Sequence, residues 1–251
     1  MKIKCKIFLV FIFLITINFV LGIEEFSSYK FSVSANLCKN FFSYEDFNNT
    51  LKTFYNQNIN KLSSNNMYFL NFNFNNNNFS PILGIGFYRS FQNTSEFPYE
   101  YYFSVITTPI TIGLQKKYKL RNKLNLEIEG NIGLYPTTFF AKEIKKDYIK
   151  NTTESFFEEW IGTGLGENIG VGLEYFLKKN FSIIFGLNYQ IVKVNEFKFN
   201  IVNLSENQKN KYEKITGKEV KIGEIVKISD SNNFKFDTNS FILKFAFCFY
   251  P

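Results

Sequence analysis

The chain ends in FILKFAFCFYP (residues 241–251), a stretch in which every second residue is bulky and apolar, and this stretch decides the fold. Strict alternation is typical of a β-strand, whose successive side chains point to opposite faces. One face carries a row of large apolar side chains: Phe241, Leu243, Phe245, Phe247 and Phe249. The opposite face carries Lys244, Ala246 and Cys248. The stretch therefore predicts a strand with one apolar wall and one face of small or polar residues.

The same alternation recurs along the chain, which indicates seven further strands. Six of the patterns are regular, whereas Pro109 interrupts the one in residues 101–118. The predicted strands are YKFSVSANL (29–37), YFLNFNF (68–74), LGIGFYRS (83–90), residues 101–118, LNLEIEGNIGLY (124–135), NIGVGLEY (168–175) and SIIFGLNYQI (182–191). Together with the final strand they make eight.

Short and long connections alternate between these strands. The short ones are residues 75–78, 119–123 and 177–180, and the long ones are residues 38–66, 91–100, 136–166 and 194–237. This pattern predicts an antiparallel up-and-down meander whose two ends differ. Within the last long connection, EVKIGEIVKI (219–228) also alternates. That alternation leaves open an extension of the neighbouring strands, or an extra hairpin that would make ten.

Such a meander could close into a soluble barrel with its apolar face inside, or into a membrane barrel with its apolar face outside. The polar face carries many glycines and several charges, which suit a narrow and crowded interior. A water-exposed face has no reason to prefer glycine, because glycine weakens strands. We therefore expect an all-β fold, an eight-stranded antiparallel up-and-down transmembrane β-barrel. A secreted soluble ligand-binding barrel is the alternative.

The N-terminus is typical of a secretory signal peptide. Lys2, Lys4 and Lys6 precede an apolar run at residues 7–21, and Gly22 follows. A run of 15 residues is shorter than the ~18 to 20 that a membrane-spanning helix needs. We expect cleavage after residues 1–22, which leaves residues 23–251 as one barrel domain. Its 26 Lys and Arg against 22 Asp and Glu make it mildly basic, and we expect no nucleic-acid partner.

Taken together, the signal, LGIGFYRS, NIGVGLEY, the unequal connections and the final strand resemble the small outer-membrane β-barrel proteins of diderm bacteria, the OmpA/OmpX-like, porin-family barrels. The resemblance implies a place in the bacterial outer membrane, in contact with its lipid. It also implies that the C-terminal strand, through Phe245, Phe247 and Phe249, is the signal read by the barrel-assembly machinery. The final two residues, Tyr250 and Pro251, depart from that pattern, because the family usually ends on the aromatic itself.

Polar residues on the inward face suggest a charge network in the lumen. The candidates are Glu127, Glu129, Glu174, Lys30 and Lys244. They could bind cations or gate conduction, or they could form ion pairs that fill an interior only wide enough for side chains; we favour the ion pairs. The chain contains no histidine, which removes His-dependent catalysis. We expect no catalytic, cofactor-binding or metal site.

The long connections and the cysteines complete the predictions. Residues 44–62 and 145–160 space aromatic residues at near-helical intervals, which suggests short helices that cap the barrel mouth or present an adhesive surface. Cys38 and Cys248 should lie about 20 to 30 Å apart, which predicts two free thiols. We expect a structural or surface-interaction role through the loops, with a possible extracellular ligand or partner. A small-solute or ion pore is the alternative.

Overall fold

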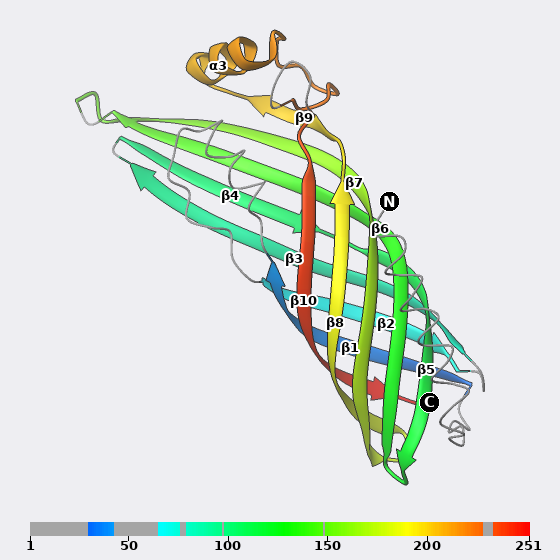
Figure 1. Cartoon of the computed structure of the whole chain (residues 1–251). Helices are drawn as coiled ribbons and strands as arrows, with labels where there is room; N and C mark the ends of the chain where they lie inside the picture. The colour runs from blue at the N-terminus through cyan, green and yellow to red at the C-terminus, as the bar shows by residue number, and fades with distance from the viewer. Residues whose placement is uncertain (1–29, 43–64, 76–78, 97, 148, 228–232) are drawn as a thin grey trace.

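The computed structural model describes residues 30–42, 65–75, 79–96, 98–147, 149–227 and 233–251. Strands dominate this part of the chain, and one helix lies between the last two of them (Figure 1). The elements are β1 (Phe31–Phe42), β2 (Asn65–Phe74), β3 (Ser80–Glu96), β4 (Tyr99–Thr107), β5 (Ile110–Arg121), β6 (Leu124–Asp147), β7 (Thr152–Lys178), β8 (Phe181–Val194), β9 (Phe197–Asn203), α3 (Glu206–Thr216) and β10 (Phe236–Phe249). No helix among the described residues is long and apolar enough to cross a membrane.

The strands close into an antiparallel ring with eight positions, as predicted. β4 and β5 share one position, because both pair with β3 on one side and β6 on the other in an unchanged register. Pro109 separates them, since proline has no N–H for the strand ladder. The ring closes where β10 pairs with β1, from Val33 opposite Phe249 to Phe42 opposite Ser240. β9 pairs only with the upper part of β7, so the ring does not reach ten.

Two predicted long connections are largely strand. Residues 91–100 belong mostly to β3 and β4, and residues 136–166 to β6 and β7. The predicted helix at residues 145–160 is therefore wrong: β6 and β7 pair without interruption from Leu124 opposite Tyr175 to Asp147 opposite Thr152. Continuous pairing satisfies the facing backbone groups of both segments, which a few aromatic residues at helical spacing cannot outweigh. Residues 44–62, the other predicted helix, lie outside the described residues.

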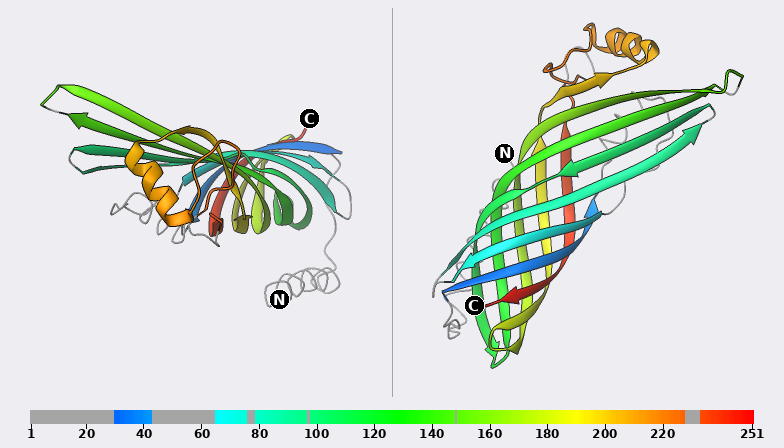
Figure 2. Two further views of the ribbon diagram at one scale, coloured as in Figure 1. Left: turned by 90° about the horizontal axis from the view of Figure 1, so that it is seen from above. Right: turned by 180° about the vertical axis from the view of Figure 1, so that it is seen from behind.

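The long connection at residues 194–237 contains β9 and α3 rather than longer flanking strands. α3 begins at a capping box, in which Ser205 and Gln208 bond each other's backbone N–H, and ends at Gly217 in the left-handed conformation. The alternating segment 219–228 contributes isolated bridges, one of which joins Lys198 to Ile225. Together with the β3–β4 and β6–β7 hairpins, these elements form an extension that leans away from the ring (Figures 1 and 2).

The two faces of the ring differ as the alternation predicts. Large apolar side chains point outward, and in β10 Phe241, Phe247 and Phe249 are 57%, 47% and 52% exposed. The inward residues between them, among them Lys244 and Cys248, are buried. A closed ring satisfies its backbone hydrogen bonds internally and faces lipid with apolar side chains, which is how strands span a membrane. The soluble barrel with an apolar interior does not fit this arrangement.

Several inward glycines leave room for neighbouring side chains to cross a narrow lumen. A Cβ on Gly86 would lie 2.6 Å from the ring of Phe69, and one on Gly166 would lie 2.3 Å from the ring of Tyr135. No side chain fits at such distances, so these two positions require glycine unless the rings move. The crowded interior that the glycines predicted is therefore present.

Candidate functional site

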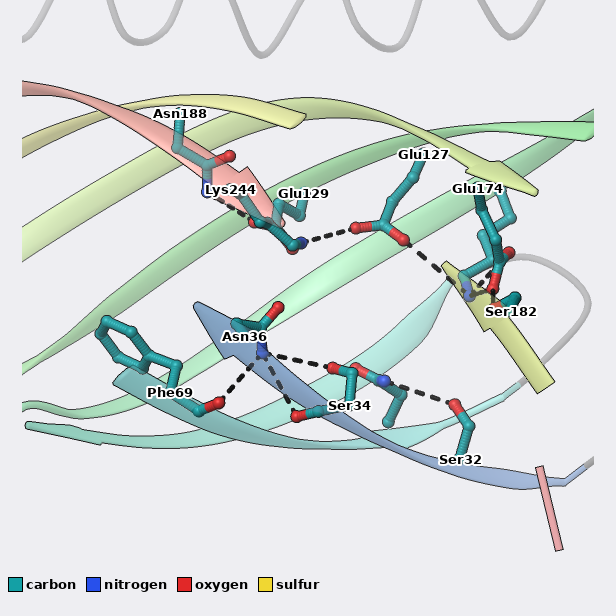
Figure 3. A network of polar contacts seen from close by, with 12 residues as sticks. Ser32, Ser34, Asn36, Phe69, Glu127, Glu129, Glu174, Ser182, Asn188 and Lys244 are labelled. Atoms are coloured by element: carbon teal, nitrogen blue, oxygen red, sulfur yellow. Dashed lines mark hydrogen bonds and ion pairs between the residues drawn. The ribbon is translucent and has the colours of Figure 1, made fainter. Parts of the chain in front are cut away.

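Lys244 lies at the centre of the barrel interior and pairs with two carboxylates of β6. Its Nζ is 2.8 Å from Glu127 Oε1 and 2.8 Å from Glu129 Oε2. Asn188 of β8 donates to the other oxygen of Glu129 at 2.6 Å (Figure 3). All four residues are buried. The network therefore joins β10, β6 and β8 across the lumen.

A second lysine extends this network toward the short turns. Lys117 Nζ of β5 lies 3.1 Å from Glu174 of β7 and 3.9 Å from Glu127 Oε2. Glu174 is fully buried and also accepts hydrogen bonds from Ser182 at 2.6 Å and Asn125 at 3.1 Å. Three carboxylates thus meet two ammonium groups, and neutral donors solvate the remaining negative charge. A buried charge without such partners would be costly.

The structure brings together four of the five predicted lumen residues: Glu127, Glu129, Glu174 and Lys244. Lys30 does not join them, because it is exposed and precedes β1 by one residue. The alternation would place Lys30 on the inward face only if residue 30 belonged to a strand of the ring. Lys117 takes part instead, and sequence reasoning missed it. The sequence could have revealed the inward position of Lys117. The apolar residues of β5 alternate with a set of small or polar residues: Thr111, Gly113, Gln115 and Lys117.

Tyr250 closes the barrel at the short-turn end. It follows the outward Phe249, turns inward and is only 2% exposed. Its hydroxyl accepts a hydrogen bond from Lys117 Nζ at 2.7 Å and donates to Glu174. Its ring packs on Phe176 at 5.3 Å between centroids. The penultimate residue, which the family resemblance did not predict, therefore completes the charge network.

An aromatic cluster closes the opposite end, above the membrane-spanning part of the ring. Its centre is Trp160 of β7, whose ring lies 4.5 Å from Phe139 and 5.0 Å from Phe234. The buried members, which we call the mouth cluster, are Tyr101, Phe103, Val105, Tyr135, Phe139, Ala141, Trp160, Val192, Val194, Phe197, Phe199, Tyr212, Val226, Phe234 and Phe236. Aromatic residues thus cap the mouth, but of residues 145–160, which the sequence suggested for this role, only Trp160 belongs to the cluster, and residues 44–62 lie outside the described residues.

Two carboxylates lie inside the extension. Burial raises the pKa of Glu158 to about 7, although the indole N–H of Trp160 donates to it at 2.8 Å. Burial also raises the pKa of Glu143, which accepts a hydrogen bond from Gln208 of α3 at 2.7 Å. Gln208 belongs to the capping box, so α3 is tied to β6 through its first turn. Burial among aromatic rings favours the protonated form of a carboxylate.

Both cysteines of the described residues are free and buried, as predicted. They lie closer together than expected, because Cys38 is opposite Lys244 while Cys248 is opposite Ser34. Four residues along a strand correspond to about 13 Å, still beyond the reach of a disulfide. Among the described residues, no group of three His, Cys, Asp or Glu side chains could hold a metal ion.

Comparisons with known proteins bear on the fold alone. No protein-family model and no curated protein sequence matches the chain. The similar solved structures include Neisserial surface protein A (NspA), at 11% identity and a TM-score of 0.46, where the match covers 88% of this chain and 97% of that one. They also include Ail, the attachment invasion locus protein of Yersinia pestis, at 13% identity and a TM-score of 0.38, with 89% of this chain and 100% of that one covered. The outer membrane protease OmpT from Escherichia coli is similar at 9% identity and a TM-score of 0.44, with 90% of this chain and 99% of that one covered.

All three are small outer-membrane β-barrel proteins, the class that the sequence resembles. Identities this low assign no activity and no residue role to this chain. The chain is a β-barrel membrane protein. This conclusion rests on its own ring of strands and on the apolar outer face of that ring.

Proposed function

We propose that the protein is a non-enzymatic barrel of the bacterial outer membrane, with a closed lumen and an extracellular extension that binds a ligand or a surface partner. The observation that carries the proposal is the charge network around Lys244. Its three carboxylates are only 0% to 4% exposed, and both lysines are engaged with them. We infer that contacts this close leave neither a solute path nor a substrate-accessible carboxylate at this level of the lumen.

The closed lumen leaves the extension as the part that meets the surroundings. Its hairpins and α3 rise above the ring and present a large surface to solvent (Figure 2). The mouth cluster holds this surface rigid, because its rings join β4, β6, β7 and β9 to α3. Rigid presentation lowers the entropic cost of binding a partner. The extension is therefore the surface on which we expect specificity to lie.

Planar-bilayer recordings of the purified barrel test the closed lumen. We expect no stable conductance steps, because the ion pairs fill the cross-section. Stable steps that disappear in Glu127→Gln or Glu129→Gln would contradict the proposal and support the alternative, an ion or small-solute pore. Glu159→Gln is the matched control, since Glu159 lies on the extension and bonds Asn200 rather than the network.

Export and assembly belong to the same proposal. We expect residues 1–22 to direct export and the apolar face of β10 to be read by the barrel-assembly machinery. Phe249→Ser should reduce the amount of folded barrel in the outer-membrane fraction, measured as the band that migrates differently before and after boiling. Cys248→Ser should leave that amount unchanged, because Cys248 points inward and takes no part in the ion pairs of the lumen. Equal loss in both variants would contradict a role specific to the outward aromatic residues.

A further inference from the structure

A groove of about 410 Å³ lies on the wall of the barrel where the first and last strands meet. This is the seam at which β10 pairs with β1 to close the ring. The lining residues come from β1, β2, β8 and β10: Leu37, Cys38, Lys39, Asn66, Phe185, Gly186, Leu243, Lys244 and Phe245. The groove is therefore a feature of ring closure.

The groove opens toward lipid. Its exposed apolar members, Leu37, Phe185 and Leu243, are 50%, 56% and 52% exposed and belong to the outward set. The backbone at Cys38 and Lys244 closes the bottom, because both side chains belong to the inward set and are buried. Two rows of outward side chains thus form apolar walls above a backbone floor, a shape that suits a hydrocarbon chain.

Lys39 places one positive charge at this groove. It is exposed on the lipid-facing side of β1, between the apolar Leu37 and Phe41, and pairs across the ladder with Leu243 and Asn66. It forms no ion pair with any side chain in the described part of the chain. A lysine facing lipid extends its ammonium to the headgroup level. The nearest headgroups are those at the long-loop end, because β1 ends there at Phe42.

We propose that the groove binds an acyl chain of a phosphate-bearing lipid of this leaflet, with the phosphate against Lys39. The apolar walls accept the chain, and the Lys39 ammonium, which has no ion-pair partner among the described residues, selects an anionic headgroup by charge. Because the groove crosses the seam, the lipid contacts β1, β8 and β10 together. The bound lipid then stabilises the ring at the place where it closes.

Native mass spectrometry of the whole mature barrel tests this site, with phosphatidic acid and phosphatidylcholine as the lipids. The wild type should retain phosphatidic acid at least fivefold better than Lys39→Gln does. Leu37→Trp should lower retention as well, because an indole on this wall fills the groove. The matched control is Lys193→Gln, an exposed outward lysine of β8 that lies opposite Asp237 and outside the groove.

Three results would overturn the proposal. Equal retention by the wild type and Lys39→Gln would show that the ammonium does not hold the lipid. An equal loss in Lys193→Gln would show that any surface charge serves. Equal retention of phosphatidylcholine, whose phosphate is balanced by a choline cation, would show that a net negative headgroup is not selected. Each variant is first checked for the heat-modifiable band, so that misfolding is not taken for loss of binding. The readout is independent of conductance and of the extension.

Discussion

At the scale of single residues, Lys244 has the largest expected effect on stability. Its ammonium lies 2.8 Å from two carboxylates, and all three groups are buried. Lys244→Met leaves Glu129 without an ammonium partner and Glu127 with only Lys117, at 3.9 Å. Removing one partner of a buried pair costs about 3 to 5 kcal/mol. We expect a matching fall in the free energy of unfolding, measured by urea titration of the heat-modifiable band.

Two further variants show whether charge is the cause. Adding Glu129→Gln to Lys244→Met removes the carboxylate that has lost its ammonium partner, so the double variant should recover part of the lost stability. Lys179→Met, in the exposed turn between β7 and β8, should behave like the wild type. A double variant less stable than Lys244→Met would indicate that the lysine acts through packing instead.

Glu158 should make the stability of the extension depend on pH. Burial raises its pKa from the ordinary value of 4.5 to about 7. Between these two values the folded chain keeps a proton that the unfolded chain releases. Stability therefore falls as the pH rises through this window, and it levels off above it. At about 1.4 kcal/mol for each pH unit, the loss is about 3 kcal/mol.

The fluorescence of Trp160, the single tryptophan of the chain, reports this unfolding. Urea midpoints should be higher at pH 5 than at pH 8, and Glu158→Gln should remove most of the difference. The buried Glu143, whose pKa burial also raises, should account for the remainder. Glu159→Gln changes the neighbouring carboxylate on the opposite face of β7. This variant should keep the full pH dependence. A pH dependence unchanged in Glu158→Gln would refute the assignment.

At the scale of elements, the capping box of α3 should decide how firmly the helix is held. Ser205 accepts a hydrogen bond from the N–H of Gln208, and the Gln208 side chain bonds both the N–H of Ser205 and Glu143. Ser205→Ala removes the N-cap and should cost about 1 kcal/mol. Faster amide hydrogen exchange in Glu206–Thr216 would reveal it.

Ser205→Asp keeps an N-cap acceptor and should restore slow exchange. Lys214→Ala, on the exposed side of the helix, serves as the control for a change of sequence alone. If Ser205→Ala exchanged as slowly as the wild type, the contact between Gln208 and Glu143 would be sufficient to hold the helix. The role assigned to the cap would then be wrong.

The elements also show which parts of the fold the sequence can predict. Alternation identified all eight ring positions, because each spanning strand has apolar side chains on the face toward lipid and small or polar side chains on the face toward the narrow interior. It underestimated β6 and β7, since beyond the ring both faces of these strands carry aromatic and charged residues without contrast. The same loss of contrast hid α3, whose helical pattern is weak. The prediction for Lys30 was wrong because the alternating pattern indicates which face of a strand a residue occupies, but not at which residue the strand begins.

At the scale of the whole molecule, the ring and the extension form two structures on shared strands. Around the ring, every position has both neighbours below Thr137 of β6 and Gly162 of β7. Above that level, β4, β6, β7 and β9 pair with one another and enclose the mouth cluster. The charge network lies in the ring and shares no residue with the mouth cluster. The two parts should therefore be separable.

Replacing residues 139–160 by Asn-Gly tests this separation. Thr138 and Ile161 face each other in the register of β6 and β7, and a two-residue turn of this type joins such a pair. We expect the shortened protein to keep the heat-modifiable band and to remain non-conducting, because the network around Lys244 is unchanged. Its urea unfolding, followed by the heat-modifiable band because Trp160 is deleted, should lose the pH dependence that Glu158 confers, since the buried Glu143 and Glu158 are both removed. Loss of the heat-modifiable band would show instead that the ring needs the mouth cluster to close, and new conductance steps would place the barrier to ions in the mouth.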